Sequence, residues 1–264
     1  YDSMGVLMLA PGATHVDLIR EKFQYIFRTI PSDQDAGRQL AGFAGLQGFR
    51  RMAIYSLDDE YGRGLAKFFA NGIQSLGILV SDRRVYEADG THNFRPVLES
   101  WKTLKLDAIF LAATMPQGAE IIAQAREVGM TLPVLGSDGL DSPELWRIAG
   151  KAAEGTVVFS VFHPGDPRSN VKDFVAAFQS AYGKVPDVWA ALGYDTVKLL
   201  AEAIKRADTT VPGEVAAALR KLRDWYGVTG THNFSQTGEL SGKPIIKKIA
   251  RNGKFEYVPE GFLR

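Results

Sequence analysis

The 264-residue chain contains no cysteine, which excludes disulfide bonds, thiolate nucleophiles and zinc sites built on cysteine. It also has almost no excess of either charge, with 31 Lys and Arg against 30 Asp and Glu. A nucleic-acid partner is therefore not expected, because such proteins carry a basic surface that attracts phosphates. No apolar run reaches the roughly 18 to 20 residues that cross a bilayer, and no basic-then-apolar leader precedes Tyr1. We therefore expect a soluble chain, or one from which a leader has been removed.

Metal-binding and catalytic motifs are also scarce. The chain has four histidines, none within five residues of another: His15, His92, His163 and His232. Zinc sites show paired ligand spacing, so no metal site is expected. The patterns Gly-x-Ser-x-Gly, Gly-x-x-x-x-Gly-Lys-Ser/Thr and Gly-x-Gly-x-x-Gly do not occur. The closest approach, Gly136-Ser137-Asp138-Gly139, follows an expected strand but has the wrong spacing for a nucleophile elbow. We expect no cofactor and no enzymatic activity.

Short apolar runs alternate with amphipathic stretches along most of the chain. The runs predict strands at 5–10, 25–30, 51–56, 78–86, 107–112, 133–136 and 156–162. The stretches between them predict helices ending near 47, and at 62–76, 94–104, 117–128 and 143–148. Strands that alternate with helices of this length are typical of βαβ units. The predicted fold class is therefore α/β, with mostly parallel sheets flanked by helices.

The chain changes character after the breaker-rich loop at 164–167. Three helical patterns follow, at 171–182, 188–206 and 213–226, and the first places four apolar residues on one face: Val171, Phe174, Val175 and Phe178. Glycines then separate strand-like segments at 245–250 and 255–258. These two pieces predict a hairpin added to the edge of a sheet.

Polar side chains follow four of the expected strands. Parallel α/β sheets bind ligands at the carboxyl ends of their strands, where loops and helix N-termini gather. Thr14, Tyr61, Thr114 and Asp138 stand at or close behind such ends. Small residues, hydroxyls, a carboxylate and an aromatic ring together suit a small polar ligand held by hydrogen bonds against an apolar wall.

Each candidate also has a structural interpretation. Thr14 could cap the helix that follows it, since threonine is a common N-cap. Asp138 could cap the helix at 143–148, although Ser142 is the better cap because a proline follows it. Tyr61 and Trp189 could simply pack in a core.

The order of several short segments resembles the leucine/isoleucine/valine-type periplasmic binding proteins, the type I solute-binding subunits of ABC importers. The resemblance covers essentially the whole chain and rests on an ordered set of segments: Pro11-Gly-Ala-Thr14, Tyr25-Ile-Phe-Arg-Thr-Ile-Pro31, Asp59-Glu-Tyr-Gly-Arg-Gly64, Asn93-Phe94, Gly136-Ser-Asp-Gly139, Ala153-Glu-Gly155 and Gly193-Tyr-Asp195.

The resemblance implies two lobes joined by three crossing segments. It places the crossings near 28–31, 162–167 and 231–235, so that one lobe comprises 1–31 and 163–233 and the other comprises 32–162 and 234–264. Family members run through about three βα units before the equivalent of 5–10. At roughly 30 residues per unit, the first lobe here is expected to lack on the order of a hundred residues.

The resemblance also implies a clamp for an amino acid. Thr14 matches a threonine that binds the ligand's carboxylate, with backbone groups of Gly12 and Ala13 beside it. Asp138 stands in the place of an acid that binds the ligand's ammonium, where the prototype has glutamate. An acid and a set of donors are what such a ligand needs, because desolvating either of its charges unpaired costs several kcal/mol.

Three further residues are expected to line the ligand. Tyr61 matches a lining tyrosine, Thr114 replaces a tyrosine, and Trp189 replaces a phenylalanine that packs on the ligand's side chain. The prediction is a periplasmic or otherwise extracytoplasmic protein that captures a small amino acid-like ligand between its lobes and delivers it to an ABC permease. The alternative is a ligand-sensing regulatory module on the same fold.

Overall fold

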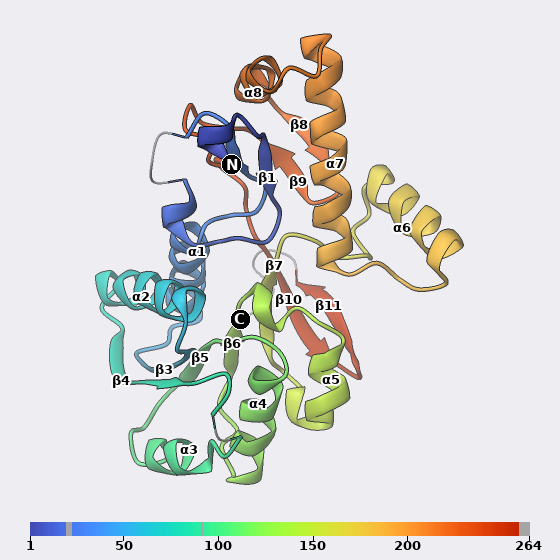
Figure 1. Ribbon diagram of the computed structural model, residues 1–264. Coiled ribbons are helices and arrows are strands. Elements are labelled where there is room, and N and C mark those ends of the chain that lie inside the picture. The colour runs from blue at the N-terminus through green and yellow to red at the C-terminus, as the bar shows by residue number, and fades with distance from the viewer. Residues whose placement is uncertain (20–22, 91, 259–264) are drawn as a thin grey trace. The chain divides into compact units, whose positions relative to one another are not determined.

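The chain folds into two compact units, drawn as ribbons in Figure 1. The computed structural model describes residues 1–19, 23–90 and 92–258. Unit 1 comprises Tyr1–Ser32 and Val161–Pro244, and unit 2 comprises Asp33–Ser160 and Ile245–Arg264. Each unit is therefore assembled from two separate stretches of the sequence.

Unit 2 holds, within its described residues, a seven-stranded sheet in the order β11-β10-β7-β6-β5-β3-β4 (Figure 1). The strands are β3 (Arg51–Leu57), β4 (Leu79–Tyr86), β5 (Ala108–Ala112), β6 (Val134–Gly136), β7 (Val157–Ser160), β10 (Ile246–Arg251) and β11 (Lys254–Val258). Neighbours from β7 to β4 run parallel, whereas β10 pairs antiparallel with both β7 and β11. The predicted parallel sheet and its edge hairpin are thus confirmed.

Helices accompany this sheet in the predicted order. They are α1 (Asp33–Leu46), α2 (Glu60–Ser75), α3 (Arg95–Trp101), α4 (Gln117–Glu127) and α5 (Glu144–Ala149), with 3-10 turns η3 (Asp138–Leu140) and η4 (Gly150–Ala153). The strands carry apolar side chains on both faces because both faces are covered. On β3, Tyr55 joins the cluster around Trp101, and Ile54 joins the opposite cluster, in which the rings of Phe69 and Phe110 stack 3.9 Å apart.

Unit 1 combines a short parallel strand pair with helices and a hairpin. Its elements are η1 (Asp2–Met4), β1 (Met8–Ala10), η2 (Val16–Leu18), β2 (Ile26–Arg28), α6 (Ser169–Tyr182), α7 (Val188–Ala207), α8 (Pro212–Lys221), β8 (Trp225–Gly227) and β9 (Gly230–His232). Phe27 of β2, Leu199 of α7 and Leu219 of α8 share one core. On α6, Val171 and Phe174 of the predicted apolar face are buried, and Val175 and Phe178 are half-buried.

The helix predicted at 213–226 is too long. The structure ends α8 at Lys221, and Leu222 is extended with ψ 131° while remaining in the core. Asp224 then adopts a positive φ of 50°, which no helix continues. Trp225 and Tyr226 belong to β8, where the Trp225 ring packs edge-on against His232 at 5.3 Å.

Residues 234–244 also differ from the sequence-based division, which assigned them to the second lobe. In the structure this segment belongs to unit 1. Phe234 and Leu240 pack into its core, with the Phe234 ring edge-on to Phe27 at 5.4 Å. Burial of these two side chains places the segment in unit 1, whereas the boundary expected from the resemblance lies before it. Residues 259–264 of the expected second lobe lie outside the described part of the chain.

Candidate functional site

The loop that follows β1 carries three of the predicted ligand-binding residues. Gly12 and Ala13 are exposed at its tip, and Thr14 is 7% exposed. His15, and not Thr14, caps the following turn, because its Nδ1 accepts a hydrogen bond from the Asp17 backbone N–H at 3.3 Å. The capping interpretation of Thr14 is therefore wrong. Within the described residues, the backbone N–H groups of Gly12, Ala13 and Thr14 have no acceptor on the protein.

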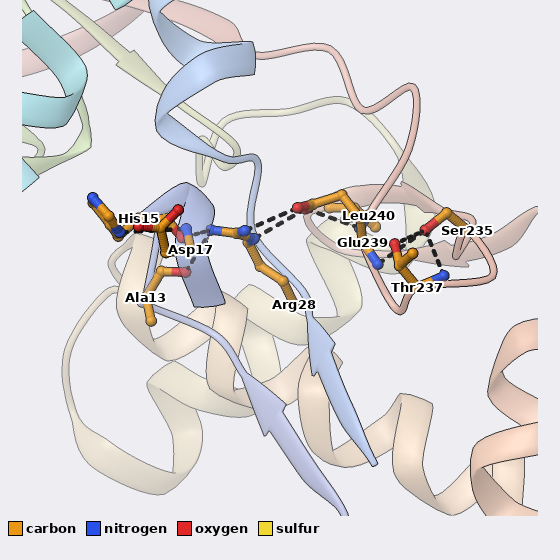
Figure 2. Close-up of polar contacts among 8 residues, drawn as sticks. All are labelled: Ala13, His15, Asp17, Arg28, Ser235, Thr237, Glu239 and Leu240. Carbon is orange, nitrogen blue, oxygen red and sulfur yellow. Dashed lines mark hydrogen bonds and ion pairs between the residues drawn. The ribbon is translucent and has the colours of Figure 1, made fainter. Parts of the chain in front are cut away.

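A buried arginine holds the backbone of this loop, as Figure 2 shows. Arg28, the last residue of β2, is fully buried, and its Nη1 donates hydrogen bonds to the carbonyl oxygens of Ala13 at 3.2 Å and His15 at 2.7 Å. Its Nε and Nη2 donate to the two carboxylate oxygens of Glu239 at 2.9 and 2.8 Å. This paired geometry compensates the charge of the guanidinium, because an unpaired charge buried away from water is costly.

Trp189 lies beside the same loop. It follows Val188 at the start of α7, whose N-cap Asp187 accepts a hydrogen bond from the Ala190 N–H at 2.8 Å. A Cβ added to Gly12 would lie 3.5 Å from the Trp189 ring. With 43% of its surface exposed, Trp189 is not a core residue. Unit 1 therefore brings together four predicted site residues: Gly12, Ala13, Thr14 and Trp189.

In unit 2, Asp138 and Tyr61 meet at the carboxyl ends of the parallel strands. The Tyr61 hydroxyl donates to Asp138 Oδ1 at 3.0 Å, and the Ser137 hydroxyl donates to the same oxygen at 2.6 Å. The Gly139 N–H in turn donates to the Tyr61 hydroxyl at 3.3 Å. Asp138 does not cap α5, whose N-cap is Pro143, and Ser142 is not its N-cap either, although the Ser142 hydroxyl accepts the Glu144 N–H at 3.2 Å. Tyr61 also packs its ring against a core cluster, as the packing interpretation expects, and its place in the ligand site stays a prediction.

Burial dominates the electrostatics of this pair. It raises the pKa of Asp138 above its ordinary value, and the hydrogen bonds from Ser137 and Tyr61 oppose that rise. Burial, reinforced by the negative charges of Asp138 and Asp33, raises the pKa of Tyr61 well above its ordinary value. Tyr61 therefore remains a neutral hydrogen-bond donor, and Asp138 is a carboxylate whose charge a cationic group would relieve.

Thr114 is not joined to this pair. It follows β5 at the same edge of the sheet, and its carbonyl oxygen accepts the Gly118 N–H at 2.8 Å at the start of α4. In the ranges that the structure describes, no hydrogen bond links its hydroxyl to Tyr61 or Asp138. The assignment of Thr114 to the ligand site stays a prediction.

Sequence analysis missed three residues that shape these clusters. Ser137 stands at the same strand end as Asp138, but the sequence analysis assigns it no role in the ligand site. Arg28 had a visible signal, since it is the one charged residue in the run Tyr25-Ile-Phe-Arg-Thr-Ile30. Glu239 had none, because 211 positions separate it from Arg28 and only the fold brings the two together.

The described residues contain no group of three or more His, Asp or Glu side chains arranged to hold a metal ion. None of the helices in these ranges combines the length and apolarity that a membrane span requires.

Comparison with known proteins decides the family. The sequence model of the periplasmic binding proteins matches residues 2–246, most of the chain. The chain belongs to the periplasmic binding protein family. As a periplasmic binding protein it is a member of a family of binding proteins and not of enzymes, as the sequence predicts.

Individual relatives of this periplasmic binding protein agree. The chain is 29% identical over 269 residues to Leu/Ile/Val-binding protein homolog 1 of Brucella suis, covering 98% of this chain and 70% of that protein. A substrate-binding protein of an ABC transporter from Desulfitobacterium hafniense, solved in complex with Leu, is 39% identical with a TM-score of 0.86, covering 98% and 75% of the two chains. LivJ from Streptococcus pneumoniae, solved with isoleucine, is 27% identical with a TM-score of 0.87, covering 97% and 73%. The predicted α/β fold of this type is confirmed.

Proposed function

We propose that this periplasmic binding protein captures a branched-chain or similar amino acid outside the cytoplasm and delivers it to an ABC permease. The relatives support the ligand class, since one is solved with Leu and another with isoleucine. The family match supports the permease partner and the extracytoplasmic location in this proposal. The observation that carries the proposal is Asp138, a half-buried carboxylate at the carboxyl end of β6 whose position two hydroxyl groups fix.

Each unit supplies contacts for one end of the ligand. In unit 2, Asp138 binds the α-ammonium group, whose charge offsets the cost of burying the carboxylate. In unit 1, the N–H groups at Gly12, Ala13 and Thr14 bind the carboxylate, together with the Thr14 hydroxyl. Trp189, beside Gly12, provides an apolar surface for the aliphatic side chain. Closure of the units on the ligand is the signal that a permease reads.

A calorimetric comparison of leucine with its two half-charged analogues tests this proposal. L-Leucine, L-isoleucine and L-valine are titrated into the protein, together with 4-methylpentanoate, which lacks the ammonium, and 3-methylbutylamine, which lacks the carboxylate. We expect at least one of the amino acids to bind, and both analogues of leucine to bind at least about tenfold more weakly than leucine, because each leaves a buried polar group of the protein unpaired. Binding of no amino acid, or equal binding of leucine and 4-methylpentanoate, would contradict the assignment.

A further inference from the structure

The guanidinium of Arg28 contacts both a carboxylate and the backbone of the loop after β1. Two of its donors neutralise its charge on Glu239, and the same guanidinium also holds the two carbonyl oxygens of Ala13 and His15 (Figure 2). These carbonyls flank Thr14. Building on the proposed function, we infer that Arg28 is a positioning residue for the ligand: it holds the Ala13–His15 backbone so that the Thr14 N–H and hydroxyl meet the ligand's carboxylate.

The geometry of the Ala13–Thr14 peptide determines where the Thr14 N–H points. The peptide between Ala13 and Thr14 is trans, and in a trans peptide the C=O and N–H bonds point in opposite directions. Because the Ala13 carbonyl points at the guanidinium, the Thr14 N–H points away from it. That N–H belongs to a residue with 7% of its surface exposed and has no acceptor among the described residues of the protein. A backbone N–H without an acceptor on the protein can bind a ligand, and an anionic oxygen suits it.

The Arg28–Glu239 ion pair is itself held in place by a tight turn that begins at Ser235. The Ser235 hydroxyl accepts hydrogen bonds from the backbone N–H groups of Thr237 at 3.2 Å and Glu239 at 3.1 Å, and the Leu240 N–H donates to Glu239 Oε1 at 3.2 Å (Figure 2). Leu240 is anchored in the core of unit 1 together with Phe27, the neighbour of Arg28. The guanidinium is therefore fixed before any ligand arrives, which is the condition for precise positioning.

Lysine cannot replace this arginine. The guanidinium is a planar fork with five donors, whereas an ammonium group is a compact point charge with three. Arg28→Lys therefore keeps the positive charge near Glu239 but loses the simultaneous hold on both carbonyls. The matched control is Arg220→Lys. Arg220, also in unit 1, donates to the carbonyl oxygens of Phe23, Gln24 and Gln236, which lie outside the ligand loop.

Calorimetry with L-leucine compares the two variants at a temperature where circular dichroism shows both to be folded. We expect Arg28→Lys to weaken leucine binding about tenfold or more and Arg220→Lys to change it less than about twofold. Hydrogen exchange without ligand provides a second readout: exchange at residues 12–16 is faster in Arg28→Lys than in Arg220→Lys. If Arg28→Lys does not fold, Glu239→Gln is tested instead. This substitution weakens the paired hydrogen bonds from the Arg28 guanidinium while keeping the shape of the side chain at 239.

A double-mutant cycle separates positioning from a general structural effect. Thr14→Val removes the hydroxyl at nearly constant volume. If Arg28 acts through the loop, Thr14→Val weakens leucine binding less in the Arg28→Lys background than in the wild type. Wild-type affinity in Arg28→Lys, or an equal cost of Thr14→Val in both backgrounds, overturns the inference and leaves the proposed function intact. Failure of the wild type to bind leucine, isoleucine or valine removes both.

Discussion

Asp138 is the residue at which stability and ligand binding oppose each other most directly. Burial raises the pKa of its carboxyl, so ionisation costs more in the folded protein without ligand than in the unfolded chain. Asp138→Asn removes this charge and still accepts hydrogen bonds from Tyr61 and Ser137. We expect the variant to unfold at a higher temperature than the wild type at neutral pH, and to bind leucine about 30-fold or more weakly because the ammonium loses its partner.

The pH dependence of that difference follows from the direction of the pKa shift. As the pH rises through the pKa of Asp138, the folded protein loses a proton less readily than the unfolded chain does, so the free energy of unfolding of the wild type falls relative to that of Asp138→Asn. Thermal denaturation of both proteins from pH 4 to pH 7 measures this. A constant difference across that range would mean that Asp138 titrates alike in both states.

Gly139 is required by close packing at the same cluster. A Cβ at this position would lie 2.3 Å from the Ala113 carbonyl oxygen and 3.0 Å from the Tyr61 hydroxyl. We expect Gly139→Ala to lower the free energy of unfolding by about 1–3 kcal/mol, since backbone must move to admit the methyl group. The control is Gly42→Ala, which meets nothing within 4 Å on the exposed side of α1 and should raise stability by about 0.5–1 kcal/mol. Chemical denaturation of both variants decides, and a stable Gly139→Ala would contradict the close approach.

At the scale of elements, a buried polar cluster joins the β8–β9 hairpin to α7. Asp195 of α7 accepts hydrogen bonds from the Val228 N–H at 2.9 Å and from the N–H and hydroxyl of Thr229 at 2.7 and 2.5 Å. Lys243 Nζ donates to the Thr229 hydroxyl oxygen at 2.7 Å and lies 3.1 Å from His232 Nε2. The polar groups of this cluster are hydrogen-bond partners of one another, so polar contacts hold the hairpin against α7.

This cluster makes stability depend on pH. Burial, assisted by the charge of Arg168 and opposed by that of Asp195, lowers the pKa of Lys243 from 10.5 to about 7, and burial lowers that of His232 to about 3. Between about pH 7 and pH 10.5 the unfolded lysine binds a proton that the folded one does not, so the free energy of unfolding rises with pH over this window. Urea denaturation of Lys243→Met should lack that rise, while Lys205→Met, at an exposed position on α7, should retain it. Parallel slopes for all three proteins would contradict the assignment.

The sequence predicts the elements of unit 2 well because burial on both faces leaves continuous apolar runs, such as Ala108–Ala112, bounded by turns. It predicts unit 1 less well. Trp225 and Tyr226 extend the apolar pattern of the preceding helix, and only the backbone shows that the helix has ended, with Leu222 extended and Asp224 at positive φ. The site residues divide in the same way. Residues that follow strand ends, such as Asp138, can be predicted from the expected order of the strands alone. Glu239 cannot be predicted in this way, because its pairing with Arg28 depends on a contact distant in sequence.

At the scale of the whole molecule, the proposed function requires that residues of both units act on one ligand. The two half-charged analogues of leucine separate their contributions. Thr14→Val should weaken binding of 4-methylpentanoate, which presents only a carboxylate, and leave 3-methylbutylamine nearly unchanged. Asp138→Asn should do the reverse, because the amine depends on the carboxylate of Asp138 alone.

Leucine itself connects the two effects. Each substitution should weaken leucine binding by about tenfold or more, and leucine at about 100 times its dissociation constant should stabilise the wild type against unfolding by roughly 2.7 kcal/mol. Both variants, measured by calorimetry on all three compounds, give a crossed pattern if each unit recognises a different end of the ligand. An uncrossed pattern, in which either substitution weakens both analogues equally, would mean that Thr14 and Asp138 influence binding through the fold and not through separate contacts with the two charges.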